Sequence, residues 1–139
     1  MKGRKMRLIA ILFSVFFAHG VMAETLYFGC EGTYRSVAGD MREFQENYAV
    51  DMTNKTWETR YRIYDDVLVS PSQISVKDIW VDGGTTNPME STDTMRISRI
   101  DLSFRRELSI KYIGFIKKNL PTEVYSGQCE IVPKLERAF

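Results

Sequence analysis

Histidine is almost absent from this sequence of 139 residues, in which His19 is the single example. His19 lies within residues 1–23, which we expect to be removed as a signal peptide, so the mature chain would hold no histidine. A chain without histidine can use neither a Ser-His nor a Cys-His nucleophile, and it cannot build an imidazole metal site. The sequence also lacks the G-x-S-x-G and S-x-x-K patterns of serine nucleophiles. These absences favour a protein that is not an enzyme and needs no metal ion or cofactor.

No apolar run in the chain is long enough to cross a bilayer. The longest, residues 8–18, has 11 residues, whereas a spanning helix needs about 20. Four positive charges precede it in residues 1–7, and a small residue, Ala23, follows it. This order is typical of a cleaved signal peptide. We therefore predict one domain over residues 24–139, in the periplasm or secreted, without stable membrane insertion after cleavage.

Cysteine is scarce as well, with Cys30 and Cys129 as its two examples. One intramolecular pairing is possible, and export to an oxidising compartment favours it. The two positions are 99 residues apart, so a bridge between them would stabilise the fold by roughly 4–5 kcal/mol in the chain-entropy model. Neither cysteine belongs to a C-x-x-C motif, which argues against a redox role. We predict a structural disulfide between the first and last strands.

The mature chain has the alternating pattern of β-strands. Phe44, Tyr48, Val50 and Met52 share one parity, and polar side chains occupy most of the other. Turn signals separate the runs every 8–15 residues. The predicted strands cover residues 26–35, 44–52, 57–63, 67–69, 73–81, 95–102, 108–112 and 124–132. A change of parity near Asp78 predicts a bulge, and residues 117–122 read as a loop.

Seven or eight short strands at this spacing predict an all-β fold. Two architectures fit: a small antiparallel β-barrel of the lipocalin-like, up-and-down type, or a sandwich. The barrel is favoured, because a disulfide between the first and last strands suits a sheet that closes where those strands pair.

The candidate binding surface combines a loop with a basic segment. Residues 82–93 form the longest loop signal, and long loops often carry binding sites. Residues 24–93 hold six basic and thirteen acidic side chains, whereas residues 94–139 hold nine and five. The candidate contact residues are Asp82, Asn87, Glu90, Arg96, Arg99, Arg105, Arg106, Lys117 and Lys118.

The partner itself stays open between a protein and a small ligand. We expect no nucleic acid, because the basic count is modest, and the oligomeric state is not predicted. The oxygen-bearing side chains of residues 82–93 do not follow EF-hand spacing, so no calcium site is expected. Two alternatives remain: a small hydrolase that works without histidine, and a structural or assembly factor of the cell envelope. An enzyme predicts a cleft with two carboxylates in unequal environments, and a structural factor predicts a long exposed strand edge.

The segment Tyr27-Phe28-Gly29-Cys30-Glu31-Gly32 resembles the opening strand of the small periplasmic barrel proteins that inhibit C-type lysozymes. That family has the same outline: a signal peptide, cysteines in the first and last strands, and β-strands throughout. The resemblance implies a barrel and, as one version of a binding role, inhibition of an enzyme. That family's Ser-Gly-x-x-Tyr loop has no counterpart here, so no functional residue is carried over.

Overall fold

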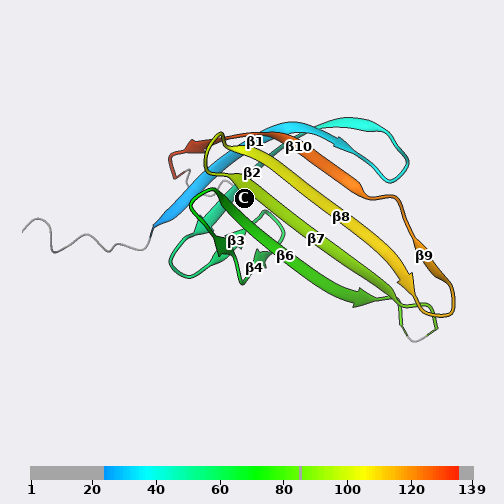
Figure 1. Ribbon diagram of the computed structural model, residues 1–139. Coiled ribbons are helices and arrows are strands. Elements are labelled where there is room, and N and C mark those ends of the chain that lie inside the picture. The colour runs from blue at the N-terminus through cyan, green and yellow to red at the C-terminus, as the bar shows by residue number, and fades with distance from the viewer. Residues whose placement is uncertain (1–23, 85, 135–139) are drawn as a thin grey trace, which may run out of the picture.

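The computed structural model describes residues 24–84 and 86–134. Residues 1–23, for which a signal peptide is predicted, lie outside them. All strands of the described part join one antiparallel sheet (Figure 1). They are β1 (Thr25–Arg35), β2 (Met41–Asp51), β3 (Thr56–Glu58), β4 (Ile63–Tyr64), β5 (Leu68–Val69), β6 (Gln73–Asp82), β7 (Met89–Ser98), β8 (Ser103–Ile113), β9 (Lys117–Asn119) and β10 (Glu123–Val132).

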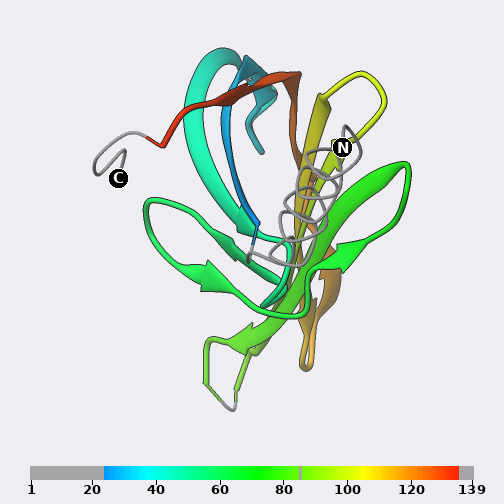
Figure 2. The same cartoon turned by 90° about the vertical axis from the view of Figure 1, so that its left-hand side faces the viewer.

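The sheet has the order β4-β3-β2-β1-β10-β8-β7-β6-β5, and β9 pairs with β8. Its two edge strands, β4 and β5, follow each other directly in the chain, so the sheet must curl to bring its edges together. Val67, between them, donates its N–H to the carbonyl oxygen of Lys55 at 3.1 Å. Figure 2 shows the resulting half-barrel. The predicted all-β antiparallel fold is confirmed. No helix in the described ranges is long and apolar enough to cross a membrane.

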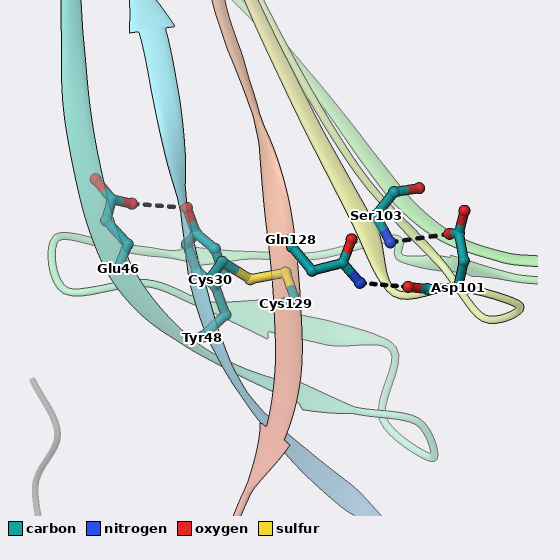
Figure 3. Close-up of a disulfide and its surroundings, with 7 residues drawn as sticks. All are labelled: Cys30, Glu46, Tyr48, Asp101, Ser103, Gln128 and Cys129. Carbon is teal, nitrogen blue, oxygen red and sulfur yellow. Dashed lines mark hydrogen bonds between the residues drawn. A yellow bond between two sulfur atoms is a disulfide. The ribbon is translucent and has the colours of Figure 1, made fainter.

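The predicted disulfide joins the first strand to the last. β1 pairs with β10 so that Cys30 stands directly opposite Cys129, with 4.0 Å between the two Cα atoms. Figure 3 shows the bridge crossing between the two strands, and both residues are buried. The bond therefore fixes the pairing of β1 with β10, two neighbouring strands that lie far apart in the sequence.

Two glycines allow β1 and β10 to approach closely beside the disulfide. Gly32 faces Gly127 in the register. A Cβ atom on Gly32 would lie 2.1 Å from the carbonyl oxygen of Ser126, and one on Gly127 would lie 2.0 Å from that of Glu31. Both contacts are with backbone, which cannot move aside cheaply. Glycine is therefore required at both positions.

The core fills the inner face of the half-barrel. Alternate residues of each long strand point inward, as the period of two predicts. Phe28, Tyr48 and Trp57 pack there beside Met95 and Ile97, all nearly inaccessible to solvent. The rings of Tyr48 and Trp57 pack edge to face, with their centroids 5.5 Å apart. This core lies towards the end of the half-barrel where β3 and β4 cover the inner face.

Several predicted boundaries differ from the structure. The bulge near Asp78 is absent, because β6 pairs with β7 without interruption from Gln73 to Asp82. The predicted loop over residues 82–93 is shorter, since β7 already begins at Met89. Ser91 and Asp93 point inward there, so polar side chains conceal the strand pattern.

Two further segments also differ from prediction. The predicted strand 57–63 is two short strands, because the Thr59 hydroxyl accepts hydrogen bonds from the N–H groups of Tyr61 and Arg62 and forms a turn. The predicted loop 117–122 begins with β9, which pairs with the end of β8.

Candidate interaction surface

Three long strands extend beyond the closed part of the half-barrel. β6, β7 and β8 have ten or eleven residues each, whereas β3, β4 and β5 have two or three. Figure 1 shows the long strands running past β3 and β4 to the end where β9 lies. We call this part the distal arm: residues 76–93 and 108–119. The short strands cannot pair with it, so one edge of the sheet remains open there.

The open edge belongs to β6. β5 pairs with Ile74 and Ser75 alone, and among the described residues no strand pairs with that side of β6 from residue 76 to residue 82. The carbonyl oxygen of Gln73 accepts the N–H of Ser70 on the β5 side, whereas that of Ser72 accepts the N–H of Arg99 on the β7 side. Successive residues of a strand face opposite neighbours.

The odd-numbered residues of β6 therefore direct their N–H and C=O groups to the open edge. Lys77, Ile79 and Val81 are the residues concerned. The side chains of Ile79 and Val81 also lie on the outer face, where they are 52% and 60% exposed. The β6 edge, as we name this stretch, thus offers main-chain hydrogen-bonding groups and apolar side chains to solvent together.

Arg62 lies against part of the β6 edge. It comes from the turn between β3 and β4, and its guanidinium forms an ion pair with Asp78. The same group stacks 4.3 Å from the ring centroid of Tyr64 and 5.6 Å from that of Trp80. The ion pair is partly exposed, and exposed pairs contribute about 0–1 kcal/mol. Arg62 therefore places a charged side chain beside this edge but adds no strand to the sheet.

A second exposed feature is the tip of the β8–β9 hairpin. Phe115 is fully exposed there and Ile116 is 63% exposed. The turn packs against the β6–β7 turn: Ile113 donates its N–H to the carbonyl oxygen of Pro88 at 3.0 Å. A Cβ atom on Gly114 would come within 2.7 Å of the Pro88 ring. The hairpin tip, residues 113–118, is thus supported from below while its apolar side chains face solvent.

Inside the half-barrel, Asp93 anchors a polar cluster. Its carboxylate is 2% exposed and accepts three hydrogen bonds. Arg106 donates from Nε at 2.9 Å and from Nη2 at 2.7 Å, and the Tyr64 hydroxyl donates at 2.9 Å. The guanidinium of Arg106 also lies 5.3 Å from the ring centroid of Tyr125.

The cluster shifts the proton affinity of its members. Burial, followed by the charge and hydrogen bond of Asp93, raises the pKa of Tyr64 to about 12. Burial alone would lower the pKa of Arg106, but the hydrogen bonds and the charge of Asp93 raise it. Burial also raises the pKa of Tyr48, whose hydroxyl donates to Glu46 at 2.7 Å (Figure 3). At neutral pH the cluster is a matched ion pair with protonated tyrosines, an arrangement suited to holding strands together.

The structure separates the predicted contact residues into several places. Asp82, Asn87, Glu90, Lys117 and Lys118 all belong to the distal arm.

The other four lie elsewhere. Arg96 and Arg105 stand on the outer face of neighbouring strands and both pair with Glu107. Arg99 is at the opposite end of β7, where it donates to the carbonyl oxygen of Ser70. Arg106 points inward to Asp93. Sequence reasoning missed the apolar residues of the arm, although Ile79 and Val81 stand on the opposite parity from Ile74 and Val76.

No protein-family model, curated protein or solved structure matches this chain. Within residues 24–84 and 86–134, no group of three or more histidine, cysteine, aspartate or glutamate side chains could hold a metal ion.

Proposed function

We propose that this chain is an exported, non-catalytic binding protein that receives an extended segment of a partner protein at the β6 edge. The observation that carries the proposal is the run of residues 76–82, a long strand edge with no neighbour on one side in the described structure. Proteins usually keep such edges short, covered or charged. Pairing of an added strand is a common mode of peptide recognition.

The β6 edge offers enough contacts for such binding. Lys77, Ile79 and Val81 present three N–H and three C=O groups, and each hydrogen bond contributes about 0.5–1.5 kcal/mol net. The side chains of Ile79 and Val81 add apolar area on the outer face. A partner segment that fits is extended and carries apolar side chains at alternate positions on this face.

Export is supported by the signal pattern in residues 1–23 and by the disulfide, which suits an oxidising compartment. An up-and-down, lipocalin-like barrel is the proposed fold type, since neighbouring strands of the sheet largely follow chain order. A non-catalytic role is supported by the state of Asp93, whose two oxygens are occupied by Arg106 and Tyr64. Inhibition of an enzyme, through insertion of the enzyme's own segment or occlusion of its cleft, is one concrete form of this role.

The test is capture of a partner from an envelope extract by the tagged mature protein. Ile79→Lys places a charge in the centre of the β6 edge, and Ile79→Pro removes an N–H that faces away from β7 and so leaves the β6–β7 ladder intact. Ile100→Lys is the matched control, because Ile100 is equally apolar and 82% exposed but lies in the turn between β7 and β8.

We expect the wild type and Ile100→Lys to retain the same specific partner, and both variants of Ile79 to lose it. Failure of the wild type to retain any specific protein contradicts the proposal. So does equal retention by Ile79→Lys and the control. Recovery of a second copy of this chain alone would replace the proposed role by that of an assembly factor.

A further inference from the structure

The hairpin tip has the composition of a membrane-surface contact. Phe115 and Ile116 protrude at the turn, and Lys117 and Lys118 follow at once. All four residues are exposed to solvent. Aromatic and aliphatic side chains with adjacent lysines are typical of segments that sit at the boundary between lipid headgroups and acyl chains.

The hairpin segment itself carries charge of one sign. Residues 108–119 contain three lysines and no acidic residue. Lys111 is held by Glu90, with 2.7 Å between Nζ and the carboxylate, so its charge is largely matched. Lys117 and Lys118 are in β9, next to the apolar turn, and they are the cations that would meet an anionic surface first.

The shape of the tip favours a bilayer over a folded protein partner. A protein that buries Phe115 must provide a pocket, whereas a bilayer accepts a convex apolar turn without one. The turn is also braced, since β8 pairs with β9 and Ile113 bonds to Pro88. A braced tip loses little conformational freedom on insertion. The positive charge complements anionic headgroups.

We propose that the β8–β9 hairpin inserts Phe115 and Ile116 into the surface of a bilayer that contains anionic phospholipid, with Lys117 and Lys118 against the headgroups. Contact of this kind is peripheral and reversible. It does not depend on the β6 edge, because the apolar tip and the edge involve different residues. A protein tethered in this way would hold the β6 edge close to the membrane surface.

The test is co-sedimentation of the mature protein with vesicles. One set contains phosphatidylglycerol and phosphatidylcholine, and the other contains phosphatidylcholine alone. The variants are Phe115→Ser with Ile116→Ser, and Lys117→Gln with Lys118→Gln. Tyr61→Ser is the matched control, because Tyr61 is an aromatic residue 83% exposed in the turn between β3 and β4. Thermal unfolding of each variant establishes that it remains folded.

Each lysine near an anionic surface strengthens binding about fivefold, so loss of both lysines should weaken binding to the anionic vesicles roughly 25-fold at low salt. Loss of Phe115 and Ile116 should weaken it at least about tenfold, since even half-burial of two such side chains is worth that factor. Tyr61→Ser should bind as the wild type does.

Any of three results with vesicles would overturn the inference. The first is no binding of the wild type to anionic vesicles. The second is equal binding to both kinds of vesicle. The third is retention of full binding by the Phe115/Ile116 variant, which would reduce the contact to adsorption of charge. A protein partner that is captured through the tip, in the absence of vesicle binding, would likewise replace the bilayer as its occupant.

Discussion

Removal of the Arg106 guanidinium should lower the free energy of unfolding far more than removal of the guanidinium of the neighbouring Arg105. Arg106→Met deletes both donors that reach Asp93 and leaves a carboxylate, 2% exposed, with the Tyr64 hydroxyl alone. A hydrogen bond to a charged group contributes about 1.5–3 kcal/mol. Breaking a buried ion pair from one side costs about 3–5 kcal/mol, because the remaining charge stays buried. We expect a loss of that size, a large share of the about 5–15 kcal/mol typical of a whole domain.

Arg105 supplies the matched control, one position along the same strand. Its guanidinium points outward, its side chain is 50% exposed, and it pairs with Glu107. Arg105→Met should therefore cost less than about 1 kcal/mol. The double variant Asp93→Leu with Arg106→Met removes both charges, so it should be more stable than Arg106→Met alone.

Urea titration gives the free energy of unfolding of all four proteins: the wild type, the two single variants and the double variant. Tryptophan fluorescence is the signal, since Trp57 is fully buried. Equal losses of stability for Arg105→Met and Arg106→Met would show that the buried pair of Arg106 with Asp93 is not the stabilising contact. So would a double variant no more stable than Arg106→Met. If Arg106→Met does not fold at all, the double variant must still fold for the argument to hold.

Three further predictions concern the closure of the sheet and its buried tyrosine. Gly127→Ala should lower the melting temperature sharply, whereas Gly29→Ala, whose added Cβ has no neighbour nearer than 3.4 Å, should have a small effect. Serine in place of both Cys30 and Cys129 should lower the free energy of unfolding by about 4–5 kcal/mol in urea titrations, and the unreduced protein should contain no free thiol. The pKa of Tyr64 rises from 10.0 to about 12 on folding, so the free energy of unfolding should fall as the pH rises from 10 to 12. In Tyr64→Phe this decrease should be smaller, by up to about 2–3 kcal/mol.

The disulfide and the strand alternation could be predicted because they depend on local or exclusive signals. Two cysteines permit one bridge, and the parity of Tyr48, Val50 and Trp57 follows from a half-buried sheet. β7 could not be oriented in this way. Ser91 and Asp93 occupy inward positions, so polar residues stand on both parities of the strand, and Ile100 and Leu102, which follow it, place apolar residues on the outward parity.

The inward orientation of Arg106 could not be predicted from the sequence for a related reason. Arginine on a strand is usually an outer-face residue. Its partner, Asp93, lies diagonally across from it, because the pairing of β7 with β8 places Met95 opposite Arg106 and Asp93 opposite Leu108. The β6 edge could not be predicted either, because it exists only where β5 is too short to pair with β6. A strand's free length depends on its neighbours, which no local pattern in residues 73–82 records.

Amide hydrogen exchange along β6, resolved residue by residue, shows whether the β6 edge is open and whether a partner pairs with it. We expect rapid exchange at Lys77, Ile79 and Val81 in the free protein, and slow exchange at Asp78 and Trp80, whose N–H groups face β7. When the captured partner is bound, the first three amides should become protected. Protection of these three amides in the free protein, or rapid exchange that persists in the complex, would show that the β6 edge is not the binding site.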